Sequence, residues 1–93
     1  MKETELEGRY RKYSEGLAQA FSTLKLTVEG EALASKVSEI VELAKCYRQD
    51  AEHFYRQNMK VTALISLAYG EGLLDALRML GYVDFKWVGS LER

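Results

Sequence analysis

Apolar residues recur at intervals of three and four along most of this chain, a spacing that predicts helices rather than strands. The pattern indicates three helices, over about residues 4–26, 30–56 and 60–80. The apolar stripe of the first contains Leu6, Tyr10, Tyr13, Leu17, Phe21, Leu24 and Val28. In the second, alternating steps of four and three residues form a heptad seam. That seam contains Leu33, Val37, Ile40, Ala44, Tyr47, Ala51 and Phe54.

The segments between the predicted helices are short, at residues 27–30 and 57–59. Thr27 is a candidate cap for the second helix, and Asn58 is a residue type that adopts the left-handed conformation where a helix ends. Short connections make neighbouring helices antiparallel. The sequence therefore predicts an all-α fold, an antiparallel up-down-up three-helix bundle with a short aromatic C-terminal tail, as one domain over residues 1–93.

The third predicted helix is apolar on nearly every side. One set of residues, the Val61 stripe, contains Val61, Ile65, Ala68, Gly72, Ala76 and Met79. A second set, the Leu67 stripe, lies largely opposite and contains Ala63, Leu67, Gly70, Leu74 and Leu77. A helix that is apolar all round is usually buried on more than one side. We therefore expect something beyond the first two helices, either the C-terminal tail or a second copy of the protein, to cover the Leu67 stripe. The alternative is a wide covered arc that leaves a leucine exposed.

Gly70 and Gly72 lie in the interior of this helix, where each glycine costs about 1 kcal/mol relative to alanine. Close helix packing is the favoured explanation, with Gly72 accommodating an aromatic side chain such as Tyr13 or Tyr47. The alternative is a groove for a ligand or partner. No phosphate-loop pattern surrounds the two glycines, which favours close packing.

The tail, residues 82–93, is too aromatic for a solvated chain end. Val83, Phe85 and Trp87 alternate with polar residues, as expected of an extended strap with one buried side. Packing of this strap on the Leu67 stripe, or on another subunit, would account for both apolar surfaces. The candidate interface contains Ala63, Leu67, Gly70, Leu74, Leu77, Phe85 and Trp87.

Few residues suggest catalysis, metal binding or disulfide formation. His53 is the only histidine and Cys46 the only cysteine, so an intramolecular disulfide and a four-cysteine zinc site are excluded. Asp50 and His53 resemble half of a carboxylate–histidine metal motif, but a solvated helical histidine is the stronger interpretation. Cys46 lies away from a helix N-terminus that would stabilise a thiolate, and we interpret it as an inert, partly buried side chain. We expect no catalytic residue, no metal and no cofactor.

A candidate ligand patch contains Tyr47, Asp50, Tyr69 and Asp75. Tyr47 and Tyr69 should lie at similar heights on the second and third helices, in an aromatic layer. Asp50 is expected about two helical turns from Asp75, so the two carboxylates are not expected to share one site. Core anchoring by the tyrosines is the default interpretation, and a shallow recognition patch is the alternative.

Charge and hydropathy argue against several classes of partner. Thirteen Lys and Arg against fourteen Asp and Glu leave a net charge of −1, whereas a nucleic-acid binder normally has a basic surplus. The longest mainly apolar stretch, Val61–Tyr69, is far shorter than the about 20 residues that span a bilayer. The charged N-terminus lacks the apolar core of a signal peptide. We therefore expect a cytoplasmic protein that binds neither nucleic acid nor membranes.

Two motifs carry a resemblance to a known family. They are Tyr47-Arg48-Gln49-Asp50-Ala51-Glu52-His53-Phe54 and Tyr69-Gly70-Glu71-Gly72-Leu73-Leu74-Asp75-Ala76, with Ala63 between them and a closing Leu80-Gly81. Together they resemble the archaeal domain of unknown function numbered 357, whose members read Tyr-x-x-Asp-Ala-x-x-Phe, then Tyr-Ala-x-Gly-x-Leu-Asp-Ala and Leu-Gly. This chain departs in having Gly70 where alanine is usual and Asn58-Met59 where the family often has Gly-Asp.

The resemblance implies a three-helix bundle of archaeal, cytoplasmic origin with no established activity and no assigned catalytic residue. Relatives attached to nucleotidyltransferase-like domains imply an accessory role. We expect a non-enzymatic helical interaction or scaffolding module that self-associates, with a homodimer favoured, through the third helix and the tail. An unidentified protein partner is compatible with this interpretation. The alternative is an accessory domain that binds a small molecule or nucleotide through the candidate ligand patch.

Overall fold

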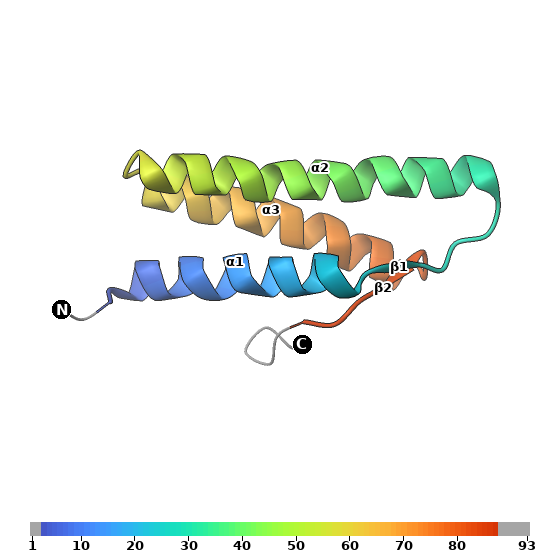
Figure 1. Cartoon of the computed structure of the whole chain (residues 1–93), viewed down its shortest axis with the longest axis horizontal. Coiled ribbons are helices and arrows are strands. Elements are labelled where there is room, and N and C mark those ends of the chain that lie inside the picture. Colours follow the sequence, from blue (N-terminus) through green and yellow to red (C-terminus); the bar gives the residue numbers. More distant parts are fainter. Residues whose placement is uncertain (1–2, 88–93) are drawn as a thin grey trace.

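The computed structural model describes residues 3–87, which form three helices and two short strands (Figure 1). The elements are α1 (Glu5–Thr23), β1 (Lys25–Leu26), α2 (Glu31–Arg56), α3 (Lys60–Met79) and β2 (Val83–Asp84). The predicted antiparallel three-helix bundle is confirmed, with helix boundaries within a few residues of those expected. The largest difference is at the end of α1, which stops before residue 26 because Lys25 and Leu26 pair with β2.

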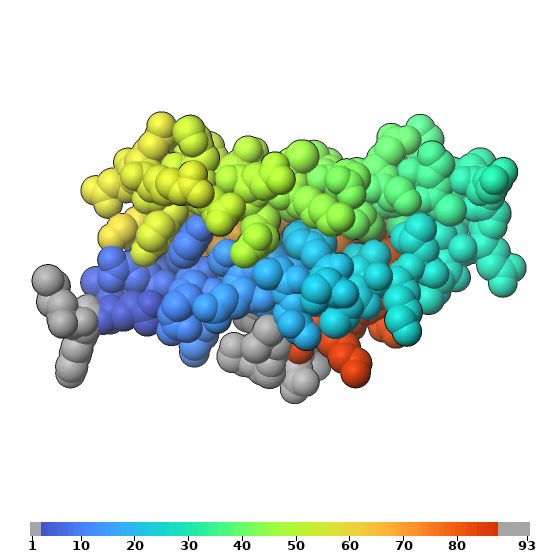
Figure 2. Space-filling model, in the orientation of Figure 1, coloured from blue at the N-terminus to red at the C-terminus, as the bar shows by residue number. Residues whose placement is uncertain are grey.

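The other two helices both pack on α3. It contacts α2 and α1 extensively, whereas α1 and α2 touch each other little. In Figure 1, α3 lies behind the other helices and crosses the space between them. The space-filling view from the same side shows α1 and α2 forming the near face and covering almost all of α3 (Figure 2). One side of α3 therefore faces the other helices, and its opposite side lies at the far face of the molecule.

Local sequence signals set the helix ends. A capping box begins α1: the Glu7 amide donates to Thr4 Oγ1 at 3.1 Å, and the Thr4 amide donates to Glu7 Oε1 at 3.0 Å. Asn58 has a φ of 63°, so its predicted left-handed conformation in the turn between α2 and α3 is confirmed. The predicted cap at Thr27 is wrong, because Gly30 precedes α2 with a φ of 93° and no side chain caps that end.

Thr27 instead fastens the chain between α1 and α2 to the end of α3. Its hydroxyl donates to the Gly81 carbonyl at 2.7 Å, and its amide donates to the Tyr82 carbonyl at 2.9 Å. Next to it β1 and β2 pair antiparallel, with Leu26 opposite Val83. The sequence pattern gave no sign of β1, since two residues are too few for a recognisable alternation.

The expected strap is confirmed up to residue 87, and residues 88–93 lie outside the described part of the chain. Val83, Phe85 and Trp87 are buried and the intervening residues are exposed. The Phe85 and Trp87 rings meet edge to face, with centroids 4.9 Å apart. The Arg78 guanidinium lies 4.6 Å from the centre of the Phe85 ring, and the Lys86 amide donates to Thr23 Oγ1 at 2.9 Å. The strap is thus held by both α1 and α3.

The core lies where all three helices and the strap meet. Its largest fully buried side chains are Leu17, Val37, Leu67 and Leu74. Gly70 provides the close approach between α3 and α2, because a Cβ there would lie 3.2 Å from the Ala44 carbonyl oxygen. The prediction assigned such an approach to Gly72, which is wrong: nothing lies within 4 Å of a Cβ at that position.

Candidate functional site

The two stripes of α3 have opposite surroundings. The Leu67 stripe faces the other helices, and each of its five residues is buried. The predicted shielding of this stripe is present, but it comes mainly from α1 and α2, with Val83, Phe85 and Trp87 of the strap in the same core cluster. The Val61 stripe lies on the opposite side of the helix, where most of its residues are exposed to solvent.

The seven candidate interface residues are therefore core residues of a single chain, which corrects the expectation that they form an intersubunit contact. Gly70 is buried, and each of the other six is at most 7% exposed. These six are Ala63, Leu67, Leu74, Leu77, Phe85 and Trp87. Side chains this deeply buried cannot reach a second subunit without unfolding their own. The physical reason is that the leucines of this stripe fill the space between the three helices, while Gly70 lets α2 approach α3 closely.

Solvent reaches an apolar surface along the opposite side of α3. Val61 is 60% exposed, Ile65 52% and Met79 87%. Beside them, Tyr69 and Leu80 are each 63% exposed. We call these five residues, together with Ala68, Gly72 and Ala76, the outer face of α3. Scattered exposed apolar residues are ordinary, whereas a continuous apolar stripe along a whole helix is a candidate contact surface.

Of the candidate ligand patch, the structure brings together only the two tyrosines. The Tyr47 and Tyr69 rings stack with centroids 5.6 Å apart, which confirms their predicted common height. The Ser66 hydroxyl donates to the Tyr47 carbonyl at 2.8 Å, and this bond fixes the register of α2 against α3. From that register, Asp50 and Asp75 lie about 18 Å apart along the bundle. They do not share a site.

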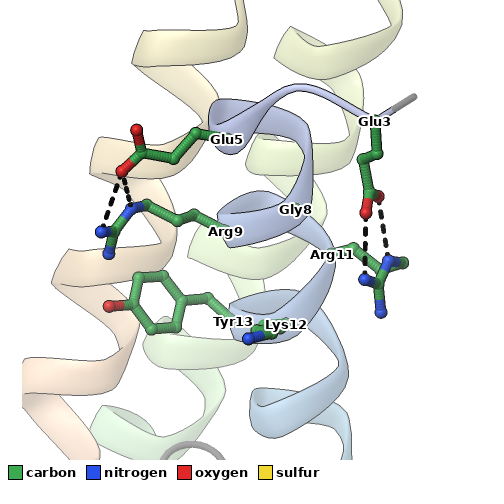
Figure 3. A pocket seen from close by; sticks show the side chains of 7 residues that line it. All are labelled: Glu3, Glu5, Gly8, Arg9, Arg11, Lys12 and Tyr13. Carbon is green, nitrogen blue, oxygen red and sulfur yellow. Dashed lines mark hydrogen bonds and ion pairs between the residues drawn. The ribbon is translucent and has the colours of Figure 1, made fainter.

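A hollow of about 500 Å³ lies beside the first turns of α1 (Figure 3). Four of its charged side chains form two ion pairs: Arg9 contacts Glu5 and Arg11 contacts Glu3, each at 3.0 Å. Figure 3 shows these two pairs on either side of the helix, with Gly8 between them. Because its lining comes from α1 and the residue Glu3 just before it, and four of its five charged side chains are paired, this hollow is a solvated surface feature and offers no convergent binding groups.

A second hollow, between α1 and α2, is lined by Ala18, Phe21, Ser22, Lys45, Arg48 and Gln49. Its two cations also have partners. Arg48 Nε donates to the Ser14 carbonyl at 3.0 Å, and Lys45 Nζ donates to Glu42 at 3.1 Å. It is a shallow groove where two helices lie side by side with little contact.

Other chemistry is sparse in the described residues. Within residues 3–87, no group of three or more His, Cys, Asp or Glu side chains is arranged to hold a metal ion. None of the helices in this range is long and apolar enough to cross a bilayer. Both His53 and Cys46 are exposed, so the expectation that Cys46 is partly buried is wrong.

One ion pair that sequence reasoning missed joins α1 to the start of α3. Lys60 Nζ donates to Glu7 Oε2 at 2.7 Å, and both side chains are less than one third exposed. The hydrogen bond from Lys60, together with those from the backbone and hydroxyl of Thr4, lowers the pKa of Glu7 to about 2. The two residues are 53 positions apart in the chain, so no local pattern announces the contact.

The chain belongs to a family described as a protein of unknown function (DUF357), whose model matches residues 12–83. The resemblance found in the motifs of α2 and α3 is thereby confirmed, and the match extends into α1. No curated protein and no solved structure matches the chain significantly.

Proposed function

We propose that this protein is a non-enzymatic helical interaction module that self-associates through the outer face of α3. The observation that carries the proposal is the exposure of that face, on which five large apolar or aromatic side chains are each more than half exposed. Association would remove this surface from water, at roughly 25 cal/mol for each Å² of apolar area. The strap, in contrast, serves the core of its own chain.

Light scattering after gel filtration, over a micromolar to millimolar concentration series, tests the proposal. The wild-type protein should have the mass of a dimer at the upper concentrations. Ile65→Glu should weaken the dimer more than about tenfold, because association would bury an unpaired carboxylate. The matched control is Leu43→Glu, which adds the same charge at an exposed leucine of α2. A wild-type monomer throughout, or equal effects of both variants, would contradict the proposal.

A ligand-binding accessory domain is the alternative, and one observation favours it. The exposed ring of Tyr69 offers a stacking surface of the kind that binds a base or another planar ligand. A nucleotide screen by thermal shift distinguishes the two functions, since a ligand at a hundredfold its Kd adds about 2.7 kcal/mol to stability. A shift that disappears in Tyr69→Ala and persists in Ile65→Glu would support binding in place of self-association.

A further inference from the structure

We propose that two copies of the protein pair antiparallel through the outer face of α3, about a two-fold axis at the midpoint of that helix. The inference rests on the proposed function and adds to it the orientation and register of the partner. A two-fold contact requires one surface to complement itself when it is reversed. The order of side chains along the outer face meets this requirement.

The outer face is nearly symmetric about position 70. Ala68 and Gly72 each lie two residues from this midpoint, and Val61 and Met79 each lie nine residues from it. An antiparallel copy therefore places Ala68 opposite Gly72 of the partner and Val61 opposite Met79. With nothing within 4 Å of a Cβ at Gly72, the centre of the face allows two helix backbones to approach closely.

Between the centre and the ends of the outer face, antiparallel pairing places a large side chain of one copy against a small side chain of the other. Ile65 lies five residues before the midpoint, opposite Asp75 of the partner, and Ala76 of the partner, one residue further on, is the nearest member of the outer face. The exposed isoleucine of one copy thus enters the space above the alanine of the other. In a parallel pair the same positions would oppose Ile65 to Ile65 and Ala76 to Ala76, which separates the helices at one point and leaves a void at another.

Tyr69 supplies an aromatic anchor next to the axis. It lies one residue from the midpoint and rests on the Tyr47 ring of its own chain. Pairing would bring the tyrosines of both copies together at the centre of the contact, where aromatic side chains contribute most to binding. In the monomer, Tyr69 is 63% exposed, so its apolar area remains in contact with water.

Electrostatics favour the same orientation. The eight residues of the outer face are uncharged, and partly exposed Asp75 lies on the same side of α3, within one helical turn of Gly72 and Met79. Antiparallel pairing places the positive N-terminal end of each α3 beside the negative C-terminal end of the other, whereas parallel pairing would place like ends together.

Isotope-filtered NMR on an equal mixture of labelled and unlabelled wild-type protein tests the register without a mutation. The expected intermolecular contacts join the methyl groups of Val61 to that of Met79, and those of Ile65 to that of Ala76. A dimer that shows Val61–Val61 and Met79–Met79 contacts would overturn the register and leave the proposed function standing. A dimer with no contacts from these methyl groups would overturn both the register and the choice of face. A monomeric diffusion coefficient at millimolar concentration would overturn the proposed function itself.

A double-mutant comparison gives a second, independent test. Ala76→Ile alone should weaken the dimer about tenfold, because two isoleucines then meet across the contact. Adding Ile65→Ala should restore the Kd to within about threefold of wild type, because the large and small residues have exchanged places. In a parallel dimer the two positions do not meet, so additive effects of the two substitutions would overturn the register. Unfolding curves of each variant confirm that the monomer fold is retained.

Discussion

The two sides of α3 are comparable in hydropathy and differ in how their large and small residues are arranged. The inward side combines Leu67, Leu74 and Leu77, which fill the space left between α1 and α2, with Gly70, which lets α2 approach closely. The outward side has three small residues in the middle, Ala68, Gly72 and Ala76, with larger apolar residues toward its ends. Hydrophobicity alone therefore does not decide which side of an apolar helix enters the core. The fit of its large and small residues to the neighbouring helices contributes as well.

The largest expected contrast in stability is between replacing a large side chain by alanine on the inward side of α3 and doing so on its outward side. Leu74→Ala should lower the free energy of unfolding by about 2–5 kcal/mol, because it leaves a cavity in a fully buried position. Ile65→Ala, at the 52% exposed position, should change the stability of the monomer by less than about 0.5 kcal/mol. Urea denaturation at a concentration that keeps the chain monomeric measures both. A similar loss of unfolding free energy in the two variants would mean that the inward and outward sides of α3 are wrongly assigned.

The two glycines provide a finer contrast. Gly72→Ala should stabilise the monomer by up to about 1 kcal/mol, because alanine is the better helix former and open space surrounds this position. Gly70→Ala should gain less or lose stability, because its Cβ would press on the Ala44 carbonyl at 3.2 Å. Thermal unfolding of both variants, at low protein concentration, gives the difference directly. If Gly70→Ala proves the more stable of the two, α3 approaches α2 less closely than described.

The smallest expected effect concerns the ion pair between Glu7 of α1 and Lys60 at the start of α3. The pKa of Glu7 is lowered from 4.5 to about 2, so its contribution to stability is complete above about pH 4.5. That contribution is lost as the pH falls from 4.5 toward 2, when the folded protein takes up the proton. Glu7→Gln should therefore reduce stability at neutral pH and flatten the acid side of the stability profile in this window. Melting temperatures measured from pH 2 to pH 7 test this. Lys60→Met should flatten the stability profile over the same pH range, because it removes the cation that pairs with Glu7.

Much of the fold follows from periodicity alone. The heptad seam of α2 correctly placed Val37, Ala44 and Ala51 in the core, and Asn58 correctly marked the turn before α3. The missed features depend on contacts between distant residues. Thr27 has the side chain of a helix cap, yet its hydroxyl bonds to Gly81, 54 residues further along the chain.

The candidate site was harder to predict, for a related reason. Both stripes of α3 could be read from the sequence, but both are apolar, so periodicity could not tell which one the other helices cover. The leucine content of the Leu67 stripe was the available clue. Tyr47 and Tyr69 were correctly placed together because the short turn sets the register of α2 against α3, whereas that same register separates Asp50 from Asp75.

The position of α3 as the helix that both others contact bears on the order in which the molecule assembles during synthesis. A ribosome adds about 5–20 residues each second, so α1 and α2 emerge seconds before the helix that supplies most of their contacts. Until then they touch each other little and leave their apolar sides in water. The bundle can close only after about residue 80 has been made, and the bond between Thr27 and Gly81 then joins the first half of the chain to the last. Folding of this small domain therefore has to wait until α3 has been made, and a product truncated before α3 could not form the bundle.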